Sequence, residues 1–179
     1  MQQTKHAEGR SSCRLSAFET IAVDFLLLCI IIKNRSLLKL KGDPMMLQTG
    51  IKGNQELTVT KDKCAGALGS GELDVFATPA MIALIEETAW KSVVPYLQPG
   101  EGTVGTALDV RHVAATPIGL QVRCETELTL VDRRRLVFRV QVFDPFGLVG
   151  EGTHERFVIQ YEKFMKKVDE KRNGIGSAT

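Results

Sequence analysis

Residues 78–90 read TPAMIALIEETAW and predict a helix that lies inside the fold. Thr78 is a suitable N-cap and Pro79 suits the first helical position, while the prolines at 95 and 99 would end the helix. Apolar side chains cover most of its circumference. Because a helix that is apolar on most sides is normally buried, we expect the rest of the chain to enclose it.

Glu86 is unusual within this helix because it is a carboxylate among apolar neighbours. At helical spacing Glu86 shares its face with Ile82 and Trp90, whereas the adjacent Glu87 can pair with Lys91 one turn later. Burying an unpaired carboxylate costs several kcal/mol, so such a group usually has a partner or a chemical task. The sequence therefore predicts that Glu86 is buried and functional, and that Glu87 is solvated.

Alternation of polar and apolar residues predicts strands around the helix. These are expected at residues 54–60, 103–113, 120–130, 135–143 and 148–160. Glycines at 66, 69 and 71 indicate a flexible loop before the helix, and the turns at 116–119, 132–133 and 144–147 are short enough for antiparallel hairpins. One helix followed by an antiparallel meander predicts an α+β hotdog fold, in which a sheet wraps around one long helix. A single curved sheet leaves strand edges and one helix flank exposed, so we expect a homodimer, and two dimers could pair into a tetramer.

Composition excludes several classes of function. The chain has 179 residues and a formal charge of +2 with both signs interspersed, so it is long enough for one domain and gives no nucleic-acid signature. Its cysteines lie far apart at Cys13, Cys29, Cys64 and Cys124. Without a C-x-x-C pair or clustered histidines they support neither a disulfide framework nor a zinc site. We expect reduced thiols, a cytoplasmic protein, no metal and no organic cofactor.

The first 45 residues differ in character from the rest. Residues 21–32 form an apolar run interrupted by Asp24, which is too short for the roughly 20 residues that span a bilayer. Acidic residues just before and within this run also fit a signal peptide poorly. Our leading interpretation is that residues 1–45 are an extension that is disordered or not part of the fold. The first alternative is an interfacial or partner-binding helix. A cleaved or anchoring segment is the least favoured interpretation.

Domain limits follow from this change in character. Met45 and Met46 are plausible true starts, and residues 46–170 are expected to form one domain. Residues 171–179 are expected to form a flexible C-terminal tail.

His112 is the histidine that alternation places in the fold. It lies on the same strand face as Leu108 and Val110, while Asp109 and Arg111 occupy the other face. His112 thus points to the apolar side. Taken alone, this pattern favours a hydrogen-bonded core or interface histidine over a catalytic one.

Several segments together resemble the fluoroacetyl-CoA thioesterase family of hotdog proteins. They are VFAT at 75–78, Met81 and Glu86, PYLQPGEGTVGT at 95–106, His112 with AATP at 114–117, and GEGTHER at 150–156. The match covers roughly residues 46–170, and the order and spacing of the segments make it fairly specific.

The resemblance implies an acyl-CoA thioesterase that hydrolyses a short-chain acyl-CoA to the free acid and CoA. It implies a catalytic set of Thr78, Glu86 and His112. It also implies substrate contacts at Gly105, near the acyl group, at Arg156 and at Phe76. CoA would be part of the substrate rather than a cofactor.

Thioester hydrolysis is compatible with these residue types. His112 belongs to the side-chain class that titrates near neutral pH and could act as a base. Glu86 could orient His112 or attack the carbonyl itself. Backbone N–H groups near the helix start or at residues 102–105 could hold the oxyanion. Thr78 could be catalytic or only a helix cap, and eight residues of helix would separate it from Glu86 by about 12 Å. Either Thr78 lies in a loop that folds back, or a second subunit completes the site.

The substrate-binding parts depart from the family pattern. The fluoroacetyl-specific enzyme carries phenylalanines in a lid segment before the helix, whereas residues 65–74 here read AGALGSGELD. We therefore expect a different or broader short-chain acyl group. The phosphoadenosine end of CoA could contact the arginines at 133–135 or the lysines at 163, 166 and 167.

Two other functions remain open. A non-catalytic acyl-CoA-binding hotdog module would need the pocket but not the pair of Glu86 and His112. A hotdog hydroxyacyl-thioester dehydratase is less favoured, because neither Asp109 nor Asp144 lies in the local context typical of such enzymes.

Overall fold

The computed structural model describes residues 46–174, so the predictions for residues 1–45 and for 175–179 lie outside the described part. Its elements are β1 (Lys52–Thr58), the 3-10 turn η1 (Lys61–Lys63), α2 (Ala65–Leu68), α3 (Thr78–Val93), the 3-10 turn η2 (Val94–Tyr96), β2 (Glu101–His112), β3 (Gln121–Asp132), β4 (Arg135–Asp144), β5 (Gly147–Gln160) and α4 (Tyr161–Arg172). The five predicted strands and the long helix are all present.

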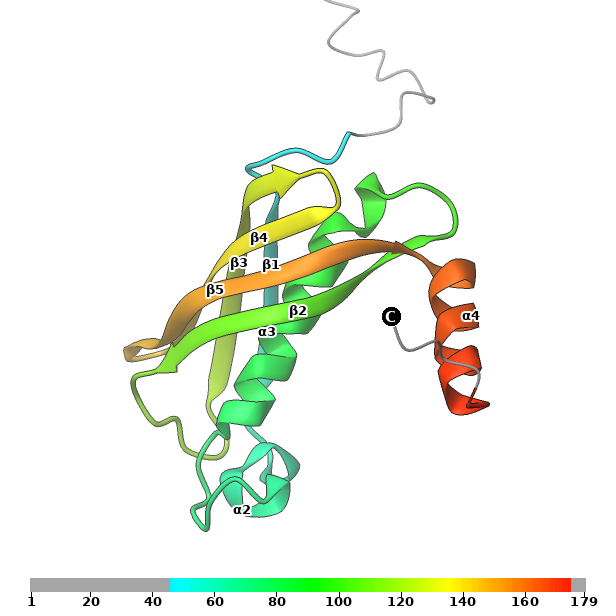
Figure 1. Cartoon of the computed structure of the whole chain (residues 1–179). Helices are drawn as coiled ribbons and strands as arrows, with labels where there is room; N and C mark the ends of the chain where they lie inside the picture. Colours follow the sequence, from blue (N-terminus) through cyan, green and yellow to red (C-terminus); the bar gives the residue numbers. More distant parts are fainter. Residues whose placement is uncertain (1–45, 175–179) are drawn as a thin grey trace, which may run out of the picture. The chain divides into compact units, whose positions relative to one another are not determined.

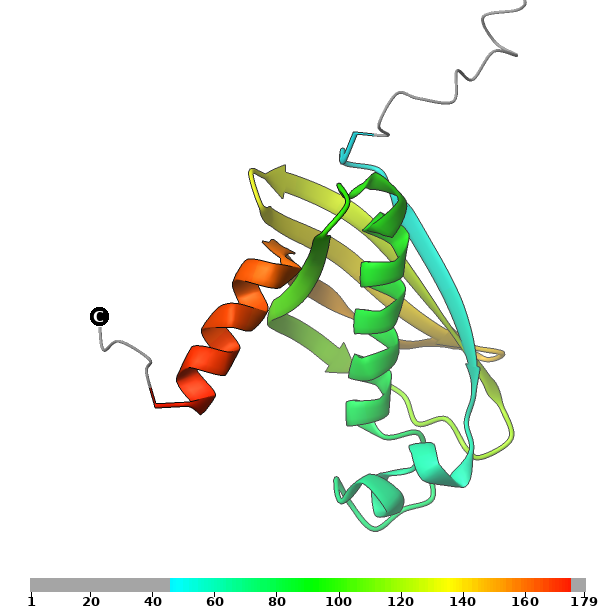
Figure 2. The same ribbon diagram turned by 90° about the vertical axis from the view of Figure 1, so that its right-hand side faces the viewer.

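All strand pairs are antiparallel, and the sheet has the order β1-β3-β4-β5-β2. The sheet curves around α3, which lies along its concave face (Figure 1, Figure 2). The hairpins β3–β4 and β4–β5 form as predicted, but the turn at 116–119 is not a hairpin. Residues 113–120 instead pair with the segment before α3, through a bridge between Val75 and Pro117, and β2 joins the sheet at its far edge beside β5.

The core lies between α3 and the concave face of the sheet. Met81, Leu84 and Ile85 of α3 are buried, and they belong to one cluster with apolar residues of the strands. The strand members are Val122, Cys124, Leu128, Leu136, Phe138, Val140, Val142, Val149 and Val158. Because each fully buried side chain of this kind contributes about 1.5–3 kcal/mol, this cluster fixes the helix on the sheet.

Two expectations about α3 are wrong. The helix begins at Thr78, so the N-cap is Ala77, which has no polar side chain to cap the helix. The Thr78 hydroxyl is instead paired with His112. The helix is also not enclosed, since Ala83 is exposed and Trp90 is 40% exposed. The curved sheet covers only one flank of α3, and no other element within residues 46–174 covers the flank that carries Ala83 and Trp90.

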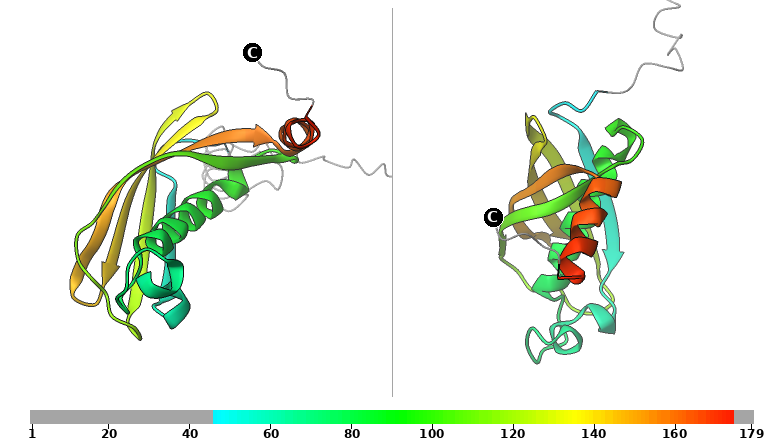
Figure 3. Two further views of the ribbon diagram at one scale, coloured as in Figure 1. Left: turned by 60° about the horizontal axis from the view of Figure 1, so that its bottom comes forward. Right: turned by 45° about the vertical axis from the view of Figure 1, so that its right-hand side comes forward.

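Two segments are more ordered than their composition suggests. The glycine-rich loop contains the short helix α2, which includes Gly66 and ends at Gly69 with a φ of 66°. The helix α4, which was not predicted, follows β5 directly and projects away from the sheet (Figure 3). Its last turn includes Lys171 and Arg172, which we had assigned to the tail. Neither Gly nor Pro separates β5 from α4, so no local signal marks the boundary between them.

No helix in residues 46–174 is long and apolar enough to cross a membrane.

Candidate active site

Thr78 and His112 form a hydrogen-bonded pair at one end of α3. Thr78 is the first residue of the helix and His112 is the last residue of β2, and 2.9 Å separates Thr78 Oγ1 from His112 Nδ1. The buried ring of Phe76 meets the imidazole edge-on, with ring centroids 6.1 Å apart. The predicted residues Phe76, Thr78 and His112 are therefore brought together.

A surface pocket opens beside this pair. Its lining residues are Ala65, Ser70, Val75, Phe76, Ala77, Thr78, His112, Val113, Ala114 and Ala115. Side chains in this set are small or apolar except at the pair itself and at Ser70. The pocket is thus suited to a short apolar group whose reacting atom lies next to Thr78 and His112.

His112 is held in a state that suits a base. Burial lowers the pKa of His112, and the backbone of Ala114 partly opposes this shift. The imidazole is therefore neutral at neutral pH. Its Nε2 atom is buried and has no hydrogen-bond partner among the described residues. A buried polar atom without a partner is costly, so this atom is available to a group that residues 46–174 do not supply.

Glu86 lies in a second cluster, farther along α3. Its side chain is 41% exposed, so the prediction that Glu86 is buried is wrong for the single chain, and the reason is again the open flank of the helix. Arg156 Nη1 lies 4.0 Å from Glu86 Oε2. Gly105, opposite Arg156 on the neighbouring strand, leaves space for the carboxylate, because a Cβ there would lie 2.9 Å from Glu86 Oε1.

Thr103 and His154, which we did not predict as site members, complete this cluster. Both accept hydrogen bonds from Arg156, which is 4% exposed. Arg156 donates to Thr103 through Nε and Nη2 and to His154 through Nη1. The spacing of His154 and Arg156, two apart on one strand, was a signal that both face α3. Thr103 carried no comparable signal because its role depends on the register between β2 and β5.

The two clusters do not meet within one chain. Thr78 and Glu86 lie eight residues apart on one continuous helix, which corresponds to about 12 Å. Because α3 begins at Thr78, the alternative in which Thr78 folds back in a loop is excluded. Phe76, Thr78 and His112 thus form one part of the candidate site, and Glu86, Gly105 and Arg156 form another.

A basic groove lies between α4 and the end of the sheet. It is lined by Val104, Thr106, Arg134, Phe157, Ile159, Gln160, Lys163, Phe164 and Lys167. The Arg134 guanidinium lies 5.1 Å from the Phe157 ring centroid and donates from Nε to the Val158 carbonyl. The groove therefore joins members of both basic segments that the sequence indicated, with Lys166 not among its lining residues.

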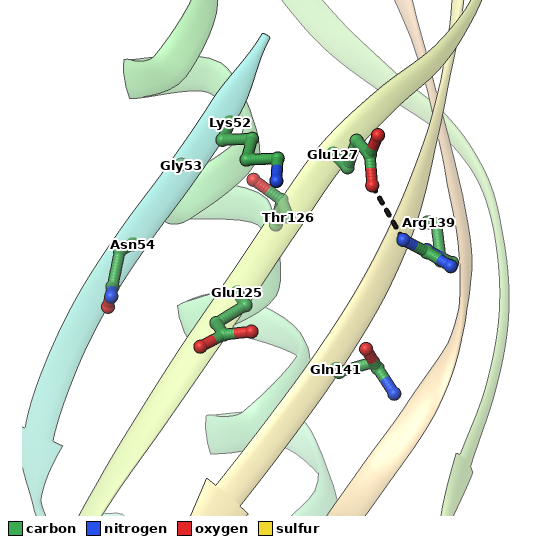
Figure 4. Close-up of a pocket in the computed structure, with 8 residues that line it drawn as sticks. All are labelled: Lys52, Gly53, Asn54, Glu125, Thr126, Glu127, Arg139 and Gln141. Atoms are coloured by element: carbon green, nitrogen blue, oxygen red, sulfur yellow. Dashed lines mark hydrogen bonds and ion pairs between the residues drawn. The ribbon is translucent and has the colours of Figure 1, made fainter. Parts of the chain in front are cut away.

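A further hollow lies on the sheet away from α3, over β1, β3 and β4 (Figure 4). Polar and charged side chains line it, and Arg139 donates to Glu127 across 2.6 Å. This pair is formed within the hollow, which contains none of the predicted site residues. Among residues 46–174 no cluster of His, Cys, Asp and Glu is arranged to hold a metal ion.

Comparison with known proteins agrees with this architecture. The family model described as FlK, fluoroacetyl-CoA-specific thioesterase, matches residues 59–162. The fluoroacetyl-CoA thioesterase of Streptantibioticus cattleyicolor is 50% identical over 98 residues, which are 55% of this chain and 70% of that protein. A solved structure of FlK superposes with a TM-score of 0.66 and 42% identity, covering 70% of this chain and 97% of FlK. A Thermus thermophilus thioesterase superfamily member, 24% identical with a TM-score of 0.65 over 74% of this chain and 99% of its own, shares the fold.

The sheet, the central helix and these likenesses define a hotdog-fold thioesterase, which is a thioester hydrolase. Within that class the chain belongs to the fluoroacetyl-CoA-specific thioesterase family. The resemblance and the hotdog fold predicted from the sequence are thereby confirmed.

Proposed function

We propose that this protein hydrolyses short-chain acyl-CoA thioesters other than, or in addition to, fluoroacetyl-CoA. The observation that carries the proposal is the pair of Thr78 Oγ1 and His112 Nδ1, 2.9 Å apart beside a small, largely apolar pocket. In the reaction the oxygen of water forms a bond to the acyl carbon and the C–S bond breaks. CoA leaves as the thiolate and takes up a proton, and the acid is released.

His112 acts as the base in this proposal. The neutral ring accepts the Thr78 hydroxyl proton at Nδ1, while Thr78 Oγ1 holds the attacking water and relays its proton. With Nδ1 as acceptor, Nε2 carries the other proton and needs an acceptor, which matches its lack of a partner among the described residues. A carboxylate at that point would orient the ring and stabilise the imidazolium, and Glu86 is the predicted carboxylate.

Because Glu86 is about 12 Å from Thr78 in its own chain, a second copy would supply it. We propose a homodimer in which the open flank of α3 and the edge strand β2 form the interface. Trp90 and Val94, which are 40% and 48% exposed on that side of the helix, support this arrangement. Dimerisation would then be a condition of activity, because each site draws on both chains.

The groove beside α4 suits the phosphoadenosine end of CoA. Arg134, Lys163 and Lys167 have no carboxylate within 4.0 Å among residues 46–174, so their charges are available to phosphate oxygens. Phe157 and Phe164 offer aromatic surface to the adenine. Val104 and Thr106 line the groove and flank Gly105 on β2. The groove and the cluster of Glu86, Gly105 and Arg156 therefore share one strand.

The acyl range follows from the segment before α3. Loop residues Leu68 and Leu73 are exposed, and the loop carries no aromatic ring to cover the pocket. A less sealed pocket discriminates less among short acyl groups, so we expect several to be accepted. The buried free thiols of Cys64 and Cys124 support a reducing, cytoplasmic setting.

The first test is thiol release from a panel of short, branched and aromatic acyl-CoAs by the full-length protein, with His112→Ala measured beside it. We expect turnover of short acyl groups that disappears in the variant. If no panel member is hydrolysed and one binds tightly, the protein is an acyl-CoA-binding module. Glu86→Gln separates the same two functions, since turnover would collapse in an enzyme and binding would be unchanged in a sensor.

A further inference from the structure

His154 is a second histidine near the candidate site, and it is fully buried. It lies on β5, with its ring stacked on Phe138 of β4 at a centroid distance of 6.4 Å. A bulge in β2 leaves Thr106 without a partner on β5, and beside it the carbonyl of Ala107 lies 3.0 Å from His154 Nδ1. The ring is thus held on two sides before any contact with the active site is considered.

The partners of His154 determine its protonation. A carbonyl can only accept, so Nδ1 must carry the proton that it donates to Ala107. A guanidinium can only donate, so Nε2, 3.0 Å from Arg156 Nη1, must be an unprotonated acceptor. The ring is therefore the neutral Nδ1–H tautomer. Burial also lowers the pKa of His154, and the charge of Arg156 lowers it further, against opposing effects of the Ala107 backbone and Glu86.

Arg156 has only neutral acceptors in direct contact. Thr103 accepts twice, through its hydroxyl and its carbonyl, each at 2.9 Å, and His154 accepts once. The carboxylate of Glu86 lies 4.0 Å away, beyond hydrogen-bond distance but close enough for a loose ion pair. The guanidinium is thus held in place by neutral acceptors. Burial lowers the pKa of Arg156, and the charge of Glu86 partly opposes this shift. Keeping such a charge buried is costly unless it is used.

We propose that His154 and Thr103 are positioning residues that hold Arg156 as a fixed cation beside Glu86 and the acyl group. This inference rests on the proposed function, because Arg156 and Glu86 belong to the candidate site. His154 acts only as a neutral acceptor, so it differs in role from His112. The charged groups that face His154 are Arg156 from its own strand and Glu86 from α3.

Nuclear magnetic resonance tests the arrangement without requiring turnover. In the full-length protein with ¹⁵N-labelled histidine and arginine, His154 should be the neutral Nδ1–H tautomer at pH 7. The Arg156 Nε–H should exchange slowly with solvent, and this protection should be lost in Thr103→Val. A cationic or Nε2-protonated His154, or protection that is unchanged in Thr103→Val, would overturn the proposal even if the protein hydrolyses acyl-CoA.

Matched variants test the consequence for the reaction, using the acyl-CoA that the wild-type protein turns over best. Thr103→Val and His154→Leu should each lower kcat by about 10-fold or more while KM changes by less than about 3-fold, because the displaced cation acts in the transition state. Thr103→Ser and His154→Gln retain an acceptor and should recover most of kcat. Thr129→Val, which removes an exposed hydroxyl on β3 away from this cluster, should leave kcat unchanged.

The outcomes separate the proposal from its foundation. If Thr103→Ser is as impaired as Thr103→Val, or if the variants lower only the Tm, His154 and Thr103 have no positioning role. If His154→Leu fails to fold, the two Thr103 variants still decide the question. If wild-type protein hydrolyses no acyl-CoA, the proposed function is wrong, and the resonance measurements alone decide whether Arg156 is held as described.

Discussion

At the scale of single residues, the candidate site depends on what each polar group contacts rather than on its neighbours in the sequence. The apolar neighbours of Glu86 in the sequence predict a buried carboxylate, but its side chain is half-exposed. Its place in the candidate site follows instead from its nearness to Gly105 and Arg156. His112 is suited to act as a base because burial lowers its pKa and its Nδ1 atom is paired with the Thr78 hydroxyl. Burial and hydrogen bonding together decide which of these groups can react.

The pH dependence of activity should reflect His112. Because burial lowers the pKa of His112, its basic form persists below the ordinary value of about 6.5. We expect kcat/KM to be level near pH 8 and to reach half of its plateau value at a pH below 6.5. A pH–rate profile measures this directly. A midpoint at or above pH 6.5 would contradict His112 as a base with a lowered pKa.

Buried neutral histidines also affect stability. The folded-state pKa is lowered for both His112 and His154, so the unfolded chain binds more protons between those values and about 6.5. The free energy of unfolding should therefore decrease as the pH falls from 7 through this window. Urea denaturation at pH 7 and pH 5.5 measures the change, and the dependence should be weaker in His154→Gln. Equal stability at both values would contradict the assignment.

Gly105→Ala should impair catalysis more than folding. The added Cβ would lie 2.9 Å from Glu86 Oε1 and 3.2 Å from His154 Cε1, and the half-exposed Glu86 side chain can move away. Because the Glu86 carboxylate would be displaced from its position, we expect kcat to fall by about 10-fold or more. The Tm should stay within a few degrees of the wild-type value. Steady-state kinetics and thermal denaturation measure the two effects. An unchanged kcat would mean that Glu86 need not occupy this position.

At the scale of elements, the segments that present Thr78 and His112 are fastened to the β4–β5 hairpin. Asp144 accepts from the Thr116 hydroxyl at 3.0 Å and from the backbone of Phe146 and Gly147 in the hairpin turn. The Thr116 carbonyl accepts from the Phe76 N–H at 2.8 Å. The segment after β2 and the segment before α3 are thereby held together. Thr78 and His112 lie side by side where these two segments meet the helix and the strand.

Replacing Thr116 by Val should loosen this connection. The hydroxyl is fully buried, so its loss leaves an Asp144 oxygen without its donor and should cost about 1–2 kcal/mol. Activity should fall as the pair of Thr78 and His112 becomes less well aligned. Chemical denaturation and kinetics measure both, with Thr129→Val, which removes an exposed hydroxyl, as control. Equal effects in the two variants would mean that the connection has no special role.

At the scale of the whole molecule, one chain contains the parts of a site but not a complete site. The two clusters lie on one helix about 12 Å apart, and the helix flank that carries Trp90 is open. A second chain packed along that flank would cover apolar surface. It would also bring its Glu86 carboxylate to the pair of Thr78 and His112 in the first chain. The proposed dimer therefore accounts for the exposed flank and for the separated clusters together.

Trp90→Glu should separate the dimer and abolish turnover. A charge on the open flank would be buried without a partner in the interface, which is strongly unfavourable. Light scattering after gel filtration measures the mass, and thiol release measures the activity. Phe146→Ser, which removes an aromatic ring that is 85% exposed at the β4–β5 turn, should change neither. A fully active monomer would disprove the shared site.

The sequence by itself determined the long helix that starts near residue 78, the five strands and the hotdog class, because periodicity and turn residues are local and the core pattern is strong. It also indicated every residue of the two clusters except Thr103 and His154. Only the tertiary structure decided that β2 lies at the far edge beside β5, that the helix has an open flank, and that Arg156 rests on Thr103 and His154. These features depend on register and on contacts between distant segments, and residues such as Thr103 and Arg156, 53 positions apart, carry no local trace of their pairing.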